Sequence, residues 1–343
     1  MKIETPPLER AATVSMLRKL VAADALSIDE AKRMEARLRA DLPWRLWLDR
    51  GLLVLGVILI VAGIGYFFAH NWQYLTENGK LLHASGSVLI AFVLAVYAGL
   101  DRFAGKLLLL AASLLVGVFI AVFGQVYQTG ADTYEMFLAW ALLIFPWVVL
   151  GRFVPLWLFC IALINLAVGF YWPVSLYLFS DSFESELCFR YETLSLLAIN
   201  LIALSLREGA AWSKINWMDR DWSAWVLLTA TLASITTETT YEILRTFDND
   251  TIAAWPATLA VVFQTGLILG FVLYFLRVRP SLPALALCTL SACCVVMTLA
   301  ARLVFLNHEE PESGQWLLMG ILVLAIFGGG VYLLRVAARS ISH

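Results

Sequence analysis

The sequence predicts an all-α, polytopic membrane protein with about ten transmembrane helices, and two observations lead to this fold class. Of the 343 residues, 61% are hydrophobic and only 15% are charged, whereas apolar residues make up roughly half of a soluble domain. The apolar residues also form repeated, continuous runs of membrane-spanning length, while the strands of a membrane β-barrel would alternate polar and apolar residues. The lipid bilayer is therefore the first expected partner.

The chain divides into two expected domains, a cytosolic helical hairpin with an interfacial collar at 1–48 and a transmembrane bundle at 49–343. Apolar residues at helical spacing predict the first helix of the hairpin: Val14, Leu17, Leu20 and Val21. Ser27 and Glu30 have the spacing of a capping box, which predicts the start of a second helix. We expect this hairpin to be a packing or docking module.

The apolar runs of the bundle predict ten spans with an error of about one. The predicted ranges are 51–69, 81–100, 106–124, 136–151, 153–172, 191–206, 222–240, 252–276, 282–304 and 315–334. The fourth span is short, and its pairing with the fifth requires a tight turn at Gly151 and Arg152.

The distribution of basic residues predicts the orientation. With the N-terminus inside, 20 of the 24 Lys and Arg residues fall in inner segments, and the remaining four are Lys80, Arg190, Arg245 and Arg302. Cytoplasmic loops of membrane proteins carry such an excess. We therefore expect both termini in the cytoplasm and a bacterial inner-membrane location.

Polar residues gather at the predicted outer ends of the spans and are the candidate binding residues. The stretch Gly117–Phe137 is the densest case, because an apolar run ends there in several polar side chains. The candidates from the first four spans are His70, Asn71, Trp72, His83, Gln125, Tyr127, Gln128, Asp132 and Glu135. If the third span continued as a helix, positions 125, 128 and 132 would share one face.

The seventh span adds a polar stripe formed by Thr231, Ser234, Glu238 and Glu242, of which the first three are further candidate binding residues. A carboxylate at membrane depth faces a bundle interior or a water-filled cavity, so Glu238 either lines such a cavity or is solvated just above the hydrocarbon. For His70 and His83, interfacial hydrogen bonding and a proton-relay or metal role are both open.

Within the spans, Asn165, Asn200 and Gln264 lie near mid-membrane and are expected to form interhelical hydrogen bonds. The five cysteines show no metal-binding spacing. We expect no cofactor, no metal site and no nucleic-acid partner.

Two short elements carry a family resemblance. Ala69-His70-Asn71-Trp72 ends the first span, and Gly124-Gln125-Val126-Tyr127-Gln128-Thr129 ends a later one. Together with the two-helix start, they resemble the bacterial inner-membrane family called domain of unknown function 2157, over about residues 10–150. The resemblance implies an integral membrane protein of bacterial type and carries no established activity.

Three functions remain open at this point. The first is transport or flipping of a small or lipid-linked solute through an outward-facing polar cavity. The second is a non-catalytic subunit of a cell-envelope complex, with a membrane-protein partner or a second copy of the chain. The third is an outer-leaflet lipid-modifying enzyme with Glu238 or Asp132 as acid or base, and His70 or His83 as its partner. We expect a protein that is not an enzyme.

Overall fold

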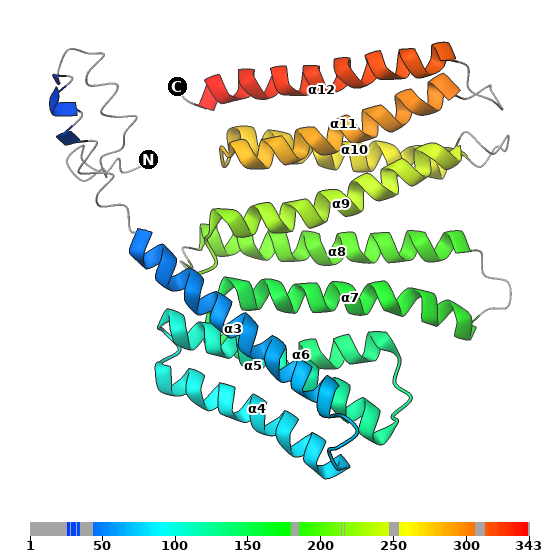
Figure 1. Ribbon diagram of the computed structural model, residues 1–343. Coiled ribbons are helices and arrows are strands. Elements are labelled where there is room, and N and C mark those ends of the chain that lie inside the picture. The colour runs from blue at the N-terminus through cyan, green and yellow to red at the C-terminus, as the bar shows by residue number, and fades with distance from the viewer. Residues whose placement is uncertain are drawn as a thin grey trace. The chain divides into compact units, whose positions relative to one another are not determined.

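The computed structural model describes residues 26–27, 29–31, 33–34, 44–179, 185–213, 215, 217–246, 254–305 and 313–341. The regular elements within these ranges are α-helices, as predicted (Figure 1). The long helices are α3 (Trp44–Asn71), α4 (Glu77–Ala98), α5 (Phe103–Tyr127), α6 (Thr133–Gly151), α7 (Val154–Phe179), α8 (Ser185–Trp212), α9 (Asp221–Thr246), α10 (Ala254–Arg277), α11 (Leu282–Phe305) and α12 (Ser313–Ile341). Contacts divide the chain into two units, Met1–Tyr66 and Phe67–His343.

In the first unit, the capping box predicted at Ser27 and Glu30 is confirmed. The Ser27 hydroxyl donates to Glu30 Oε2 over 2.8 Å, and the Glu30 N–H donates back to Ser27 Oγ over 3.2 Å. The hydrogen bond from the Ser27 side chain lowers the pKa of the Glu30 carboxyl. Most of the predicted hairpin at 1–48 lies outside the described residues.

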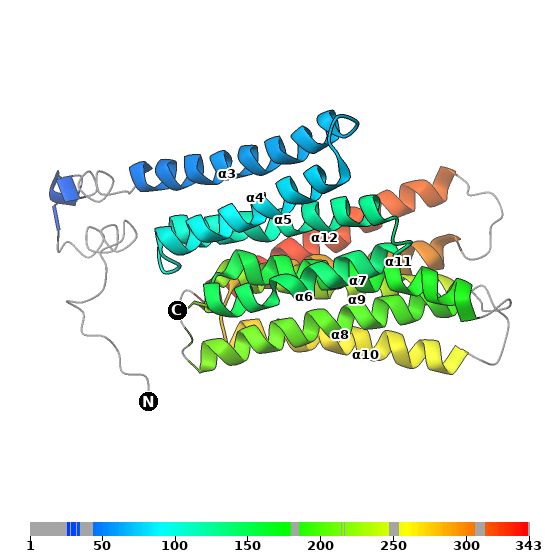
Figure 2. The same ribbon diagram turned by 90° about the horizontal axis from the view of Figure 1, so that it is seen from below.

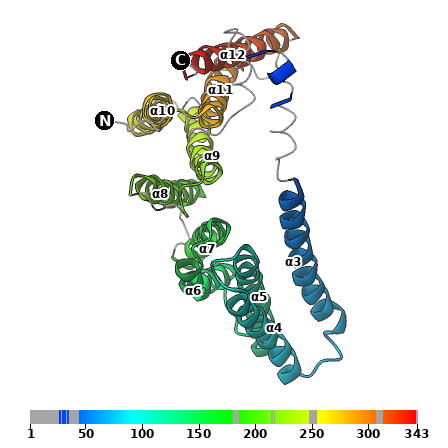
Figure 3. The same cartoon turned by 90° about the vertical axis from the view of Figure 1, so that its left-hand side faces the viewer.

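In the second unit, α4 to α12 run side by side and pack mainly against their neighbours in sequence (Figures 1 and 2). The view along the helices in Figure 3 shows this succession, with α9 between α8 and α11. α9 is an exception, because it packs against α11 as well as against its sequence neighbours α8 and α10. One apolar core joins α4 to α7 and another joins α8 to α11.

Helices occur at all ten predicted spans, and nine of the described helices are long and apolar enough to cross a membrane. The seventh predicted span, α9, lies outside that set because of its many polar residues. Its 26 residues extend about 39 Å, which is enough to span the hydrocarbon. Because Thr231, Glu238 and Thr239 on α9 are buried, neighbouring helices rather than lipid surround its polar groups. We treat α9 as a tenth, internal span.

Close packing explains why α5 carries small residues. A Cβ at Gly117 would lie 2.2 Å from the ring of Trp140 on α6, so only glycine allows the indole to approach. The Trp140 Nε1–H donates to the Ser113 carbonyl over 2.7 Å. Ala111, Ala112 and Ser113 are buried, so this face of small residues on α5 is a helix-packing surface.

The predicted turn between the fourth and fifth spans is also confirmed. α6 ends at Gly151 and α7 begins at Val154. Arg152 makes the turn in the left-handed region, with φ of 44°. The connections between α4 and α5, α6 and α7, α8 and α9, and α10 and α11 lie at one end of the helices (Figure 1), and each contains an arginine.

Candidate functional site

The predicted residues near the first and second spans have local partners. The Asn71 side chain donates to the Phe67 carbonyl over 3.0 Å. His83 Nδ1 lies 2.6 Å from the Gly79 carbonyl oxygen. The Lys80 ammonium lies over the Trp72 ring, 3.9 Å from its centroid, and so forms a cation–π contact. His70 and His83 are both exposed.

The stretch Gly117–Phe137 contains a helix end and a helix start. α5 ends at Tyr127, and Gln128 adopts a left-handed conformation with φ of 46°. The Thr129 N–H closes the end by donating to the Gly124 carbonyl over 3.3 Å, which is the long-range bond of a Schellman motif. Glycine or asparagine is the usual residue at the position of Gln128.

The condition under which positions 125, 128 and 132 would share a helix face is therefore not met. The helix stops before Asp132, which is the N-cap of α6 and forms a capping box with Glu135. The Asp132 N–H donates to Glu135 Oε2 over 3.2 Å. Gln125, Tyr127, Gln128, Asp132 and Glu135 are exposed. The two carboxylates have a structural role in starting α6.

Three members of the polar stripe on α9 are buried, namely Thr231, Glu238 and Glu242. Glu238 is 2% exposed and forms a hydrogen bond with the Thr193 hydroxyl. Arg190 Nε lies 3.8 Å from Glu238 Oε1, and the same guanidinium pairs with Glu242. Glu238 is thus neither solvated at the surface nor in contact with Gln125 and Gln128 through any described hydrogen bond or ion pair.

Arg190 and Thr193 were not among the predicted site residues. Arg190 carried one signal, since it is one of only four basic residues on the predicted outer side. Arg190 lies beside the buried carboxylates of Glu238 and Glu242. A buried charge in a membrane protein needs a partner of opposite charge, and Arg190 is that partner. Thr193 carried no signal, because threonine is common in helices of this kind.

Further α9 side chains bond to α10 and α11. The Thr239 hydroxyl donates to Gln264 Oε1 over 2.7 Å, and the hydroxyl oxygens of Thr236 and Ser291 are 2.6 Å apart. These contacts confirm the interhelical role predicted for Gln264. They also show that Thr236 connects α9 to α11 and that Thr239 connects α9 to α10.

Asn165 on α7 and Asn200 on α8 form a reciprocal amide pair. Asn200 Nδ2 donates to Asn165 Oδ1 over 2.8 Å, and Asn165 Nδ2 donates to Asn200 Oδ1 over 3.3 Å. Each Nδ2 also donates to a carbonyl of its own helix, at Ile161 and Leu196 respectively. The interhelical hydrogen bond predicted for these residues is confirmed.

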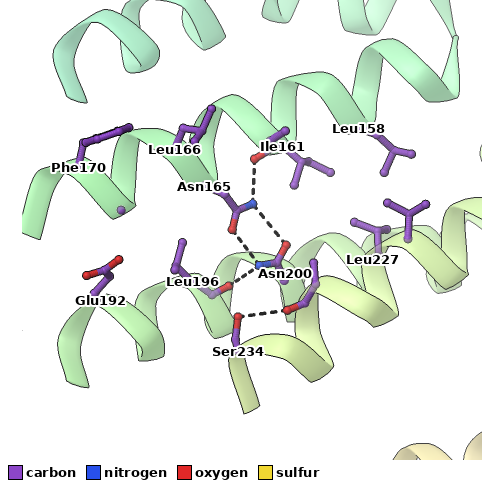
Figure 4. Close-up of a pocket in the computed structure, with 14 residues that line it drawn as sticks. Leu158, Ile161, Asn165, Leu166, Phe170, Glu192, Leu196, Asn200, Leu227 and Ser234 are labelled. Carbon is purple, nitrogen blue, oxygen red and sulfur yellow. Dashed lines mark hydrogen bonds between the residues drawn. The ribbon is translucent and has the colours of Figure 1, made fainter. Parts of the chain in front are cut away.

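This amide pair lies in a groove between α7, α8 and α9, which we call the α7–α9 groove (Figure 4). The groove has a volume of about 730 Å³ and an open side. It is lined mainly by apolar side chains, with four polar exceptions: Asn165, Glu192, Asn200 and Ser234. From Leu158 to Phe170 on α7 it extends about 18 Å along the helix.

Glu192 places a carboxylate at one end of the α7–α9 groove. Its side chain is half-buried and points into the groove near Leu166 and Phe170 (Figure 4). A Cβ at Gly169 would lie 3.6 Å from Glu192 Oε1, so this glycine leaves room beside the carboxylate. Sequence reasoning did not select Glu192, although it is an acidic residue only three positions inside the apolar part of α8.

At the opposite end of the same helices, a charge cluster joins α8 to two connections. Arg207 is 1% exposed and pairs with Glu208 and Asp219. Arg279 pairs with the same two carboxylates, over 3.1 Å and 2.8 Å. The hydrogen bond from Arg279 lowers the pKa of the Asp219 carboxyl. Arg207 and Glu208 lie on α8, and the sequence had suggested only that this end is basic.

Among the described residues, no group of three or more His, Cys, Asp or Glu side chains could hold a metal ion. Four cysteines, Cys160, Cys288, Cys293 and Cys294, are free thiols within helices.

Residues 18–157 match the model of a family described as "Predicted membrane protein (DUF2157)". This is the family that the two sequence elements resemble, and the match covers α3 to α6, the start of α7 and the segment before them. α8 to α12 and every residue that lines the α7–α9 groove lie beyond the matched residues. No curated protein and no solved structure matches the chain.

Proposed function

We propose that this membrane protein moves an amphiphilic, lipid-linked solute across the bilayer along the α7–α9 groove. The observation that carries the proposal is the position of polar side chains within an otherwise apolar groove. An amphiphile could keep its hydrocarbon chain in the lipid while its head group follows these polar side chains.

The depth of the groove supports this proposal. Asn165 lies about 17 Å along α7 from Val154, near the middle of a hydrocarbon layer about 30 Å thick. Glu192 lies close to the start of the apolar segment Phe189–Trp212. The groove therefore offers polar contacts near one membrane surface and again at mid-depth, where an unpaired head group is least stable.

The site of transport differs from the one expected from the sequence. The outer cavity lined by His70, Gln125 and Glu238 has no support from the described contacts, because Glu238 is buried between helices and Gln125 is exposed at a helix end. The groove instead uses Asn165 and Asn200, whose interhelical bonds hold α7 against α8.

A flipping assay in vesicles tests the proposal. The purified chain is reconstituted with fluorescent, acyl-labelled lipids and alkylamines, and dithionite then bleaches the label in the outer leaflet. We expect at least one probe to become fully accessible faster than in protein-free vesicles. Ala162→Trp, which fills the groove, should abolish this movement.

Ala139→Trp is the matched control, because Ala139 is an exposed residue of α6 that does not line the groove. Its flipping rate should equal that of the unmodified chain. If no probe moves faster than in empty vesicles, or if both tryptophan variants behave alike, the proposed function is wrong.

The second candidate is a non-catalytic subunit of a cell-envelope membrane complex. The observation that favours it is the packing at the end of the helix row, where α12 packs chiefly against α11 among the described helices of Phe67–His343. A second protein or a second copy of the chain would fit against such an end. Purification from membranes that always yields the chain alone as a monomer would contradict this candidate.

A further inference from the structure

We propose that the α7–α9 groove selects an amphiphile whose head group is an alkylammonium ion without a neighbouring phosphate. This inference rests on the proposed function and specifies its substrate class.

The amide pair has no free donor. Both hydrogens of Asn165 Nδ2 are used, by the Ile161 carbonyl and Asn200 Oδ1. Both hydrogens of Asn200 Nδ2 are used, by the Leu196 carbonyl and Asn165 Oδ1. Each Oδ1 accepts one of these bonds and keeps a second lone pair. At mid-depth the groove can therefore accept hydrogen bonds from a ligand but cannot donate them.

The other two polar side chains have the same character. The Ser234 hydroxyl donates its single proton to the Ala230 carbonyl over 3.2 Å (Figure 4), which leaves its oxygen as an acceptor. An ionised Glu192 is acceptor-only, and no described side chain donates a hydrogen bond to it. Every polar side chain of the lining thus requires a donor from the ligand.

The charge of the groove lining further limits the class of ligand that can bind. Glu192 is the only charged side chain among the 14 residues that line the groove, so the described lining carries one negative charge and no positive charge. A phosphate or sulfate inside this groove would meet carboxylate and carbonyl oxygens with nothing to neutralise it. An ammonium ion supplies both the counter-charge for Glu192 and several N–H donors.

The apolar remainder of the lining identifies the source of the ammonium group. Leu158, Leu166 and Val226 surround the polar residues, and the groove lies at the depth of the hydrocarbon. A soluble amine would leave these side chains without a partner. The hydrocarbon chain of a membrane-resident amphiphile would pack against these side chains. We therefore assign the groove to an amphiphile from the membrane.

Equilibrium binding with four ligands of identical chain length tests this specificity. Radiolabelled hexadecylamine is bound to the purified chain in nanodiscs and displaced by hexadecyltrimethylammonium, hexadecanol or hexadecyl sulfate. We expect unlabelled hexadecylamine to bind about tenfold or more tightly than each of the others, because among the four ligands only the amine offers both a positive charge and N–H donors to Glu192. The quaternary ion tests the donor requirement, since it has charge but no N–H group.

Glu192→Gln should weaken hexadecylamine binding about tenfold or more while leaving hexadecanol binding unchanged. Glu192→Asp should restore much of the preference for the amine, and this conservative variant guards against a misfolded Gln variant. Glu135→Gln is the matched control, because Glu135 is an exposed carboxylate outside the groove. The control should bind hexadecylamine as the unmodified chain does.

Two results would overturn the inference. One is equal affinity for hexadecylamine and hexadecanol, and the other is an unchanged amine affinity in well-folded Glu192→Gln. If either occurs while Ala162→Trp still blocks lipid movement, the substrate class is wrong and the transport proposal stands. If hexadecylamine binds as expected but no probe crosses the bilayer, the binding site stands and transport is wrong.

Discussion

Removing the amide pair between α7 and α8 should reveal a strong energetic coupling between Asn165 and Asn200. The variants are Asn165→Leu, Asn200→Leu and the double variant, because leucine has a similar size and no polar atoms. Each single substitution deletes both interhelical bonds, of 2.8 Å and 3.3 Å. It also leaves the remaining amide with one N–H and one oxygen that have lost their partner.

The size of the effect follows from this loss. An interhelical hydrogen bond in a membrane protein contributes about 0.6 kcal/mol and at most about 1.7 kcal/mol. Two bonds and one orphaned amide give an expected destabilisation of about 1–2 kcal/mol for each single variant. The double variant has no orphaned amide, so it should cost about as much as one single variant. The coupling energy is then about 1 kcal/mol or more.

Unfolding in mixed detergent micelles, followed by helical circular dichroism, measures these free energies. Gln264→Leu provides the matched reference, because Gln264 bonds to Thr239 on α9 and shares no hydrogen bond with Asn165. Asn165→Leu and Gln264→Leu should add within about 0.5 kcal/mol. Additive effects of equal size in the Asn165/Asn200 cycle would show that the two amides do not bond to each other.

Three further predictions concern single positions. Gly117→Ala should destabilise the chain by about 1–3 kcal/mol in the same unfolding assay, because the new methyl group overlaps the ring of Trp140. Gln128→Gly should raise the free energy of unfolding by up to about 1 kcal/mol, because glycine removes the strain of the left-handed conformation. Asp219→Asn should lower the thermal midpoint at neutral pH and have no effect at acidic pH. Arg279 lowers the pKa of Asp219 in the folded state. The stabilisation by this ion pair is therefore present above the unfolded pKa and is lost as the pH falls through the folded pKa. Because Asp219 is partly exposed, we expect Asp219→Asn to lower the free energy of unfolding by less than about 1 kcal/mol.

Controls for these predictions come from the chain itself. Gly266→Ala places a Cβ where no atom lies within 4 Å, so it should leave stability almost unchanged. A Gly117→Ala variant as stable as Gly266→Ala would contradict the packing described for α5 and α6. A destabilising Gln128→Gly would contradict the strain assigned to that helix end, and an Asp219→Asn effect that grows at acidic pH would contradict the ion pair.

The helices and their packing could be predicted from the sequence because both depend on local composition. Continuous apolar runs predicted the positions of all ten long helices. The Gly151–Arg152 turn followed from the length of chain available between two spans. α9 was the hardest helix to classify, since its polar residues are satisfied by α8, α10 and α11 and so lower its hydropathy without excluding it from the bundle.

The candidate site could not be predicted in the same way, because its members come from helices whose facing sides the sequence does not specify. Glu238 was expected either to line a cavity or to be solvated just above the hydrocarbon, yet it is buried and its partners are Thr193 and Arg190 on α8. Asp132 and Glu135 were selected for their charge, but in the structure they form the capping box at the start of α6. Glu192 was overlooked, because one carboxylate near the end of an apolar segment resembles a solvated interfacial residue.

A polar residue in a membrane helix can bond to another helix, cap a helix end or contact a ligand, and only its free hydrogen-bonding capacity separates these uses. Gln128 and Asp132 act at helix ends, and Glu238 bonds between helices. In the α7–α9 groove, by contrast, Asn165 and Asn200 have used every donor on each other and on their own backbones, while acceptor capacity remains. That surplus of acceptors beside Glu192 is what makes the groove, rather than the polar end of α5, the place where a donor-rich ligand would bind.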